Sequence, residues 1–247
     1  MTGGSRLVLV VSAVILAIGL AAGGWFAGLG VATLRQAERL VTVKGLAERA
    51  VRADLAIWPL RFARTGDDLA AVQSGLDRDL AAARRFLEDS GFSGDELEAQ
   101  PPQVTDLLAQ AYRPEDAENN RFIIGQTLLL RTEAVDRMVD LSRRIGDLVR
   151  QGVVLGDSTG GPLAGPTYLF TGLNAIKPAM IAEATANARD GASQFARDSD
   201  SRLGPIQEAS QGLFVILPRD PVPGAGEESQ VDKTVRVVST ISFRLED

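Results

Sequence analysis

Small side chains recur at helical spacing in the stretch Gly165–Gly204 and limit what this part of the chain can pack against. The spacing predicts one face of a long α-helix, formed by Ile181, Ala184, Ala188, Ala192 and Phe195. Alanine on such a face lets another backbone approach closely, so we expect the helix to pack flat on a β-sheet. Gly172-Leu173-Asn174 predicts the turn that connects this helix to a preceding strand at Thr167–Thr171.

The composition removes several classes of chemistry. The 247 residues include no cysteine and no histidine, which excludes disulfides, thiol nucleophiles, histidine-based triads and zinc sites of the usual nitrogen and sulfur type. The 26 basic and 32 acidic residues are interspersed and give a net charge of −6, so we expect no nucleic-acid partner. An enzyme built from this chain would depend on carboxylates, lysine, tyrosine or serine.

We therefore expect no catalytic activity, no catalytic residues, no cofactor and no metal site. The alternative is a hydrolase or lyase that uses carboxylates, with candidate residues Asp67, Asp68, Asp157, Tyr168 and Lys177. Loops and helix caps explain these residues more simply, because Thr65-Gly-Asp-Asp68 is typical of a helix start. The glycine-rich stretch Gly152–Gly165 contains neither GxGxxG nor GK[ST], which favours a solvated loop over a phosphate site.

A run of 26 residues without a charge, Leu7 to Ala32, is long enough to span a bilayer and longer than the core of a signal peptide. We predict a transmembrane helix from Leu7 to Phe26, with Trp25 and Phe26 at the far interface. The alternative is a signal peptide cleaved after Ala22 or Ala32.

Only six residues precede this run, which favours a short cytoplasmic tail and translocation of the rest of the chain. Residues 1–33 would then be a membrane anchor with its tail, and residues 34–247 a periplasmic domain. The expected location is the inner membrane, with a single span.

The rest of the chain predicts an α+β fold, in which amphipathic helices cover one face of mainly antiparallel sheets. Strands are expected at Val41–Gly45, Ala53–Arg64, Glu96–Tyr112, Arg121–Arg131, Ile206–Leu217 and Lys233–Leu245. Two further helices are expected, one opened by Thr65-Gly-Asp-Asp68 and one over Val135–Val149. Because Arg64-Thr65 and Arg131-Thr132 each precede a helix, we predict a weak internal strand-helix-strand repeat.

Prolines mark the expected sheet edges. Pro59 cannot donate a ladder hydrogen bond, so Trp58-Pro59 should lie at an edge or a bulge, with Trp58 as a packed aromatic residue rather than a ligand site. Pro101-Pro102 marks the first arm of a hairpin over Glu96–Arg131 in the same way. Such edges, together with Leu107, Leu108 and Tyr112, predict contact surfaces for a second copy. The alternative is that the hairpin folds back over its own domain.

Four segments together resemble the SIMPL-domain family of bacterial envelope proteins. They are the strand Val41–Gly45, the turn Gly172-Leu-Asn174, the alanine-spaced helix ending in Leu203-Gly204, and the strand Val235–Leu245. The likeness covers about residues 40 to 246. It departs at Leu46-Ala47 and Ala53-Asp54, where members often carry a second glycine and a Pro-Asp pair.

The resemblance implies a periplasmic or membrane-associated α+β domain that assembles into large homo-oligomers, and it implies no established catalytic residues. We expect a membrane-anchored, self-assembling envelope protein that acts as a scaffold or binding module in envelope maintenance or stress tolerance. An accessory protein that binds a transport or signalling partner in the envelope is the alternative.

Overall fold

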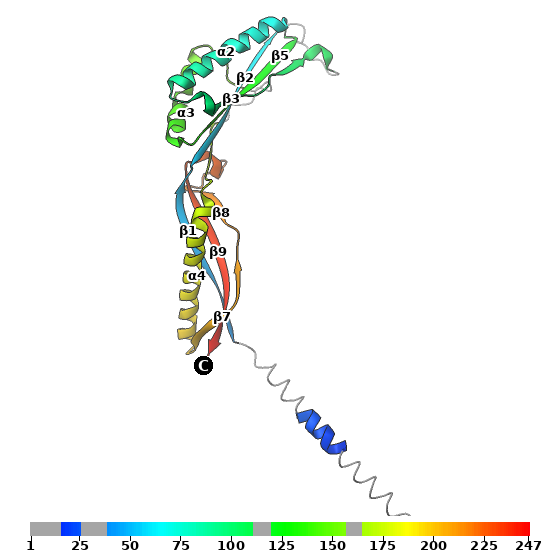
Figure 1. The fold of residues 1–247 in the computed structure, drawn as a ribbon, viewed down its shortest axis with the longest axis vertical. Coiled ribbons are helices and arrows are strands. Elements are labelled where there is room, and N and C mark those ends of the chain that lie inside the picture. The colour runs from blue at the N-terminus through cyan, green and yellow to red at the C-terminus, as the bar shows by residue number, and fades with distance from the viewer. Residues whose placement is uncertain (1–15, 26–38, 111–119, 157–164) are drawn as a thin grey trace, which may run out of the picture. The chain divides into compact units, whose positions relative to one another are not determined.

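The computed structural model describes residues 16–25, 39–110, 120–156 and 165–247, and these residues form α-helices and antiparallel sheets (Figure 1). The chain divides into two compact units. One contains Leu46–Asn187 and Gln211–Ser239, and the other contains Met1–Gly45, Ala188–Ser210 and Thr240–Asp247. The α+β class is as predicted.

The larger unit contains a five-stranded sheet centred on two long antiparallel strands. These are β2 (Leu55–Gly66) and β5 (Phe122–Thr132). The short strands β3 (Leu97–Ala99) and β4 (Gln103–Asp106) pair with β5, and β6 (Thr167–Leu169) pairs with β2. The prediction of an edge at Pro59 is confirmed, because β6 pairs with β2 only as far as Ile57.

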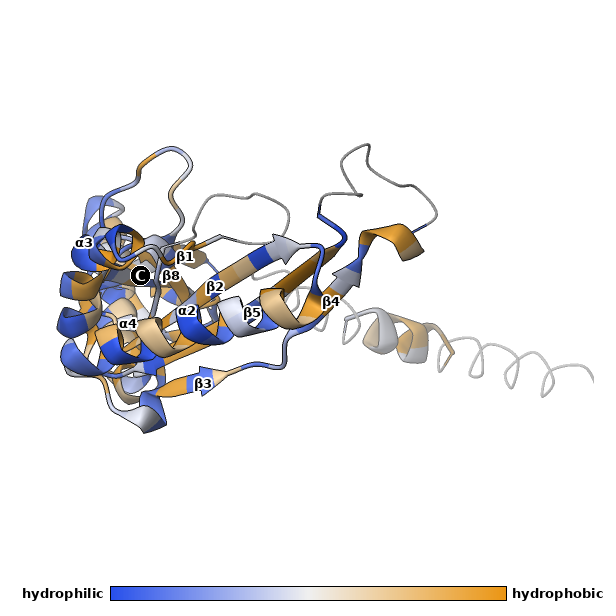
Figure 2. Cartoon of the chain, turned by 90° about the horizontal axis from the view of Figure 1, so that it is seen from above, coloured by the Kyte–Doolittle hydropathy of each residue, from blue (hydrophilic) through white to orange (hydrophobic). Residues whose placement is uncertain are grey.

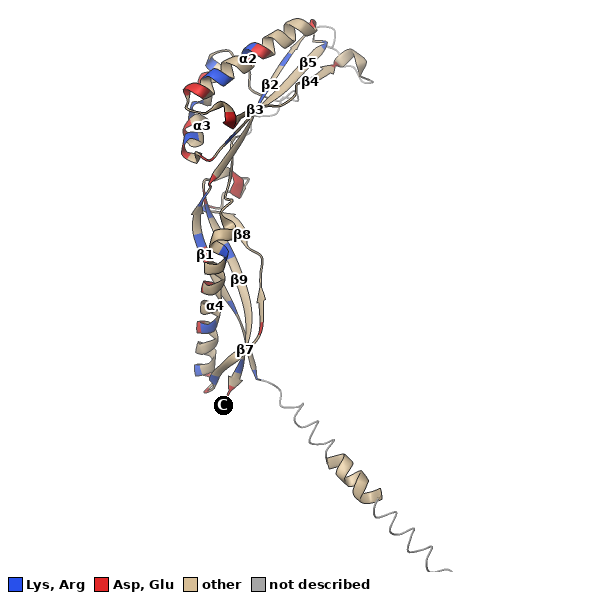
Figure 3. Ribbon diagram, in the orientation of Figure 1, with Lys and Arg blue, Asp and Glu red and all other residues tan. Residues whose placement is uncertain are grey.

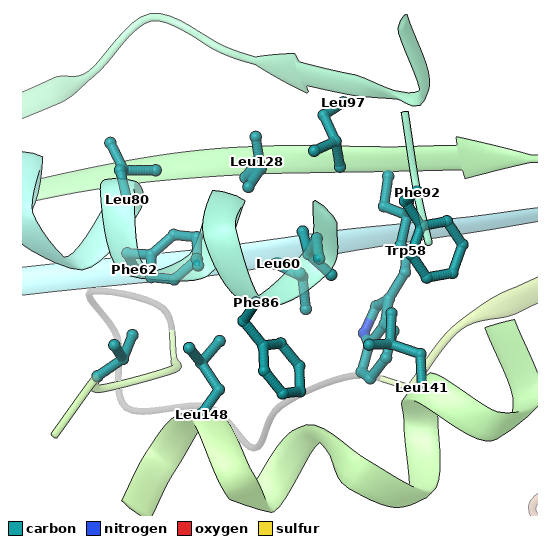
Figure 4. Close-up of a cluster of buried hydrophobic side chains, with 14 of the residues drawn as sticks. Trp58, Leu60, Phe62, Leu80, Phe86, Phe92, Leu97, Leu128, Leu141 and Leu148 are labelled. Carbon is teal, nitrogen blue, oxygen red and sulfur yellow. The ribbon is translucent and has the colours of Figure 1, made fainter. Parts of the chain in front are cut away.

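Two amphipathic helices, α2 (Leu69–Asp89) and α3 (Val135–Arg150), complete the core of this sheet (Figure 4). Side chains from the sheet and both helices are almost fully buried, among them Trp58, Leu60, Phe62, Leu76, Leu87, Ile124, Leu128, Met138 and Leu141. Hydrophobic residues follow β2 and β5 under the more polar outer surface of α2 (Figure 2). Trp58 is therefore a packed aromatic residue, as predicted. Each central strand leads into a helix, which is the order expected from the weak repeat.

The second sheet consists of β1 (Leu40–Arg52), β9 (Asp232–Glu246), β7 (Arg202–Gln211) and β8 (Val215–Pro218). β9 lies between β1 and β7, and β8 also pairs with β9. The long helix α4 (Leu173–Asp198) packs on this sheet through two clusters. Ala188 and Ala192 contact the cluster of Val43, Ile241 and Phe243, and in the other unit Met180 and Ala184 pack with Ala47, Val235 and Val237.

The buried face of α4 confirms the prediction of an alanine row, with one difference. The buried residues are Met180, Ala184, Ala188, Ala192 and Ala196. Phe195 is 60% exposed, so its assignment to this face was wrong, and Ile181 is only half-buried. The spacing is four throughout, and such a row is inclined to the helix axis. A residue three positions after Ala192 therefore points away from the strands.

Helix α2 begins at the end of the stretch Thr65-Gly-Asp-Asp68 that was expected to open it. Its N-cap is Asp68, whose carboxylate accepts a hydrogen bond from the backbone N–H of Ala71 at 2.7 Å. Thr65 still belongs to β2, where it pairs with Ile123 and does not cap the helix. The helix ends with Ser90 as the C-cap, and Gly91 has φ 89°, a conformation that favours glycine.

The first arm of the predicted hairpin is interrupted. β3 and β4 both pair with β5, but Gln100 to Pro102 separate them, since Pro101 and Pro102 cannot donate to the ladder. Leu107 and Leu108 form a 3₁₀ turn, η2 (Leu107–Ala109), rather than a strand, and both are half-buried. Tyr112 lies outside the described residues.

The strand predicted over Ile206–Leu217 is two strands, β7 and β8. The break includes Gly212, whose N–H donates to the carbonyl of Val238 at 2.8 Å. A Cβ at position 212 would lie 2.8 Å from that same oxygen, so a side chain does not fit there. The helix expected to end at Leu203-Gly204 ends at Asp198, and Gly204 lies in β7.

The predicted transmembrane helix Leu7–Phe26 lies mostly outside the described residues. Residues 16–25 are helical, and their side chains are exposed. Within the described part of the chain, no helix is both long enough and apolar enough to cross a membrane.

Within the larger unit, a polar network connects the turn η1 (Gly94–Glu96) to β5 and α3. The Glu96 carboxylate accepts hydrogen bonds from the backbone N–H of Ser93 at 2.8 Å and from the hydroxyl of Thr132. Arg137 of α3 lies 3.6 Å from the same carboxylate. Burial acts most strongly on Glu96 and pushes its pKa up, but the hydrogen bonds and the charge of Arg137 together outweigh burial and lower the pKa.

We predict that Ala188→Leu destabilises the fold, because the added atoms must fit between α4 and the sheet. Overpacking of this kind costs about 1–3 kcal/mol of unfolding free energy. The matched control is Ala186→Leu, since Ala186 is exposed on the same helix and should change stability by no more than about 0.5 kcal/mol. Chemical denaturation measures both values. Equal losses for the two variants would contradict the packing described here.

We also predict that Glu96→Gln lowers the unfolding free energy by about 1–3 kcal/mol near pH 7. A carboxylate whose folded pKa is depressed stabilises the protein above its unfolded pKa of about 4.3, and this contribution is lost as the pH falls through the folded pKa. The difference between wild type and variant should therefore shrink in acid. Denaturation at several pH values tests this, with the exposed neighbour Asp95→Asn as control. A pH-independent difference would show that the charge of Glu96 is not the cause.

Candidate functional site

The candidate catalytic acids have structural roles. Asp68 caps α2, and Asp67 accepts a hydrogen bond from the backbone N–H of Arg121 at 3.4 Å. Asp157 lies outside the described residues. Among the described candidates, no hydrogen bond or ion pair joins any two of Asp67, Asp68, Tyr168 and Lys177.

Tyr168 and Lys177 are likewise engaged separately. Tyr168 is 6% exposed in β6, and burial raises the pKa of its phenol, although Ser142 and the charge of Arg143 act in the opposite direction. Lys177 donates to the side chain of Asn174 at 2.9 Å, and its ammonium lies 5.7 Å from the ring centre of Phe214. These positions do not form a nucleophile with a base within hydrogen-bond reach.

The described part of the chain contains no group of side chains that could bind a metal ion. Over residues 16–25, 39–110, 120–156 and 165–247, no three acidic side chains are grouped so that they could hold an ion. Calcium takes about 6–8 oxygen ligands, with carboxylates among them. The chain also has no histidine or cysteine, which are the usual ligands of zinc.

Three acidic residues that the sequence did not single out hold the fold together. Asp54 accepts hydrogen bonds from the backbone N–H groups of Thr171, at 2.8 Å, and Gly172, at 3.0 Å, just before α4. Asp79 is buried and binds Arg64 of β2 through both carboxylate oxygens, at 2.6 and 2.8 Å. Glu227 pairs with Lys233, whose side chain is fully buried. No spacing in the sequence distinguishes these acids from solvated ones, because their partners lie far away in the chain or on another element.

The strand margins are the remaining candidate for function, because a margin exposes unpaired backbone groups. β1 and β7 lie at the two ends of their strand order, and β8 pairs with β9 alone among the described strands. The side chains of β7 are exposed on both faces from Pro205 to Gln211. In the other sheet, β3 and β4 pair only with β5.

Several of these margins carry features that oppose pairing with another strand. The side chain of Asn187 in α4 donates to the carbonyl of Leu46 at 2.7 Å, so part of the β1 backbone is already occupied. β7 contains Pro205, and Pro101-Pro102 interrupt the margin formed by β3 and β4. Proline at an edge limits pairing because it lacks a donor.

The margin of β8 differs from the others in its side chains. Residues 213–217 are Leu-Phe-Val-Ile-Leu, without a charge or a proline. Figure 3 accordingly shows the β8 strand without a charged residue. Leu213 is 87% exposed and Val215 is 44% exposed, whereas Phe214 and Ile216 pack against the α4 cluster. This exposed apolar margin was not anticipated from the sequence, where the same residues were assigned to the last part of one long strand, Ile206–Leu217.

Comparison with known protein families gives a match. The family described as "SIMPL: Protein of unknown function (DUF541)" matches residues 41–243, which include both sheets and α2, α3 and α4. A search of curated proteins gives no match. The family match spans most of the chain and agrees with the resemblance carried by the strands at both ends and the alanine-rich helix, so the chain belongs to the SIMPL (DUF541) family.

Proposed function

We propose that this protein is a membrane-anchored, self-assembling envelope protein that acts as a scaffold or binding module and has no catalytic activity. The observation that carries the proposal is the exposure of apolar side chains at an uncovered strand margin, with Leu213 87% exposed and Val215 44% exposed. Exposed apolar residues are common one at a time, but contiguous apolar patches mark sites of association.

The placement of the acidic residues supports a binding role over chemistry. Asp68 caps a helix, Asp79 neutralises Arg64, and Glu96 joins a turn to β5 and α3. Each of these carboxylates is engaged in holding secondary structure together. A hydrolase needs at least one such group directed toward a substrate, with a second group within reach.

The anchor part of the proposal rests on the uncharged run that begins at Leu7. Leu7 to Phe26 would cross the inner membrane once, and the domain after residue 33 would lie in the periplasm. A scaffold tethered in this way is confined near the membrane surface, which raises its local concentration and favours assembly of weakly associating copies.

Self-assembly is tested by sedimentation of the full-length protein in mild detergent over a wide range of concentration. We expect a mass that is a multiple of the monomer's and falls on dilution. The matched comparison is the double variant Leu107→Asp, Leu108→Asp, which tests whether the hairpin margin takes part in assembly. Both leucines are half-buried, so the fold of this variant must be checked as well. A monomer at every concentration would contradict self-assembly. Co-purification of a different envelope protein with that monomer would favour the accessory role instead.

The anchor is tested by the intact mass of the protein recovered from bacterial membranes. We expect a chain that retains Leu7–Phe26 and that alkaline carbonate does not extract, because a spanning helix is held by burial of its apolar surface. Protease added to spheroplasts should degrade the domain after residue 33. A mature chain that begins near Gln36 would show that the segment is a cleaved signal, and a domain protected in spheroplasts would contradict the periplasmic location.

A further inference from the structure

We propose that the free margin of β8 pairs antiparallel with the same segment of a second copy, with residues 213–217 forming the contact. This inference rests on the proposed self-assembly and assigns it to one strand margin.

One side of β8 is paired with a strand, and the other side has no described strand beside it. β8 pairs with β9 through Val215 opposite Arg236 and Leu217 opposite Thr234, and no other described strand pairs with it. β8 ends in Pro218, but residues 213–217 carry neither a charge nor a proline. An apolar edge segment of this kind is open to pairing with another chain. The segment also matches the composition of short strands that associate strongly, with high β-propensity and no net charge.

The side chains of residues 213–217 restrict which kind of strand could pair beside β8. Phe214 and Ile216 lie on the face that packs with the α4 cluster, and Leu213 and Val215 lie on the opposite, open face. A strand added beside β8 must therefore be apolar on both faces. Ordinary amphipathic strands place polar residues on one face and would leave one of these two surfaces uncovered. The same segment of a second copy satisfies both faces at once.

The residues around the β8 margin carry no charge that would repel the same segment of a second copy. From Ala209 to Pro218 the chain carries no charged residue. Antiparallel pairing of this segment with itself about a two-fold axis therefore brings no like charges opposite each other, which would destabilise the pair. At the far end Arg219 already pairs with Asp232 at 3.1 Å, and this ion pair marks the end of the apolar segment.

The other margins support the same choice. Asn187 occupies the carbonyl of Leu46 on β1, and Pro101-Pro102 interrupt the margin of β3 and β4. The margin formed by residues 213–217 has neither obstacle. Among the described margins of the larger unit, pairing at β8 would remove the most exposed apolar side chain, Leu213, from water.

Single-cysteine scanning of the full-length protein tests the pairing, because the natural chain contains no cysteine. Cysteine is placed in turn at each position from 213 to 217, and disulfide formation is measured under mild oxidation at concentrations where the wild type is assembled. At the two-fold axis of an antiparallel pair, a residue and its copy lie about 4.5–5.5 Å apart, within the range of a disulfide. One position away they are displaced by a further ~7 Å along the strands, which is too far.

We expect one position among the five to cross-link at least tenfold faster than the control, with a sharp fall on both sides. The control is Val222→Cys, which replaces an equally apolar, 54% exposed residue that lies outside the named strands. If the wild type assembles but no position from 213 to 217 exceeds the control, β8 is not the interface and self-assembly itself stands. If the wild type is a monomer throughout, both proposals fail.

A second pair of variants gives a readout that does not depend on oxidation. Val215→Lys places a charge at the margin, as natural edge strands do, and should raise the concentration for half-dissociation at least tenfold. Val222→Lys should leave it unchanged. Thermal unfolding monitors the fold of both variants. Unchanged assembly in a folded Val215→Lys protein would overturn the inference.

Discussion

The close contact between α4 and the strands β1 and β9 is the interaction on which the second sheet depends. The helix presents alanine at four successive positions of a row that begins with Met180. Alanine contributes little buried area of its own, so the strand side chains Val43, Val237 and Phe243 supply the apolar surface while the helix backbone comes close enough to cover them. A larger side chain anywhere in the row would separate the layers and weaken contacts on both of its sides.

This arrangement has a consequence for the surface. Among the described residues, α4 packs on one face of the second sheet, and no other described helix packs on this sheet through a buried cluster. The chain occupies part of the exposed backbone with its own groups, as Asn187 does on β1. At β8 no described strand other than β9 pairs with the backbone, and Leu213 and Val215 are exposed. In the assembly proposed above, a second copy would cover this margin without another element being added to the fold.

Much of the fold follows from periodicity in the sequence. Helical spacing in α4 predicts that Ala184, Ala188 and Ala192 face a sheet, and the structure confirms these three residues but not Phe195. Elements that depend on backbone hydrogen bonds to distant strands were harder to predict. The split between β7 and β8 depends on Gly212 donating to Val238, and the interrupted arm at Pro101-Pro102 depends on the pairing of β5 with two separate strands. No local pattern encodes either contact.

The candidate site was less predictable than the fold, for a related reason. Carboxylates such as Asp54 and Asp79 look like ordinary solvated acids until the fold brings Gly172 and Arg64 to them. The apolar residues of β8 look like the interior of a strand, because a sequence shows that a residue is apolar but not that its neighbour is missing. The absence of histidine and cysteine was more informative, since it removes whole classes of catalysis without reference to any contact.

Amide hydrogen exchange of the full-length protein, compared below and above the concentration at which it assembles, tests the central claim most directly. Backbone pairing at a strand margin protects its amides, whereas side-chain contacts alone protect them little. If β8 pairs with its copy, exchange across residues 213–217 slows on assembly while α2 and α3 remain unchanged. Slower exchange in β7 or in the margin of β3 and β4, with residues 213–217 unaffected, would contradict it.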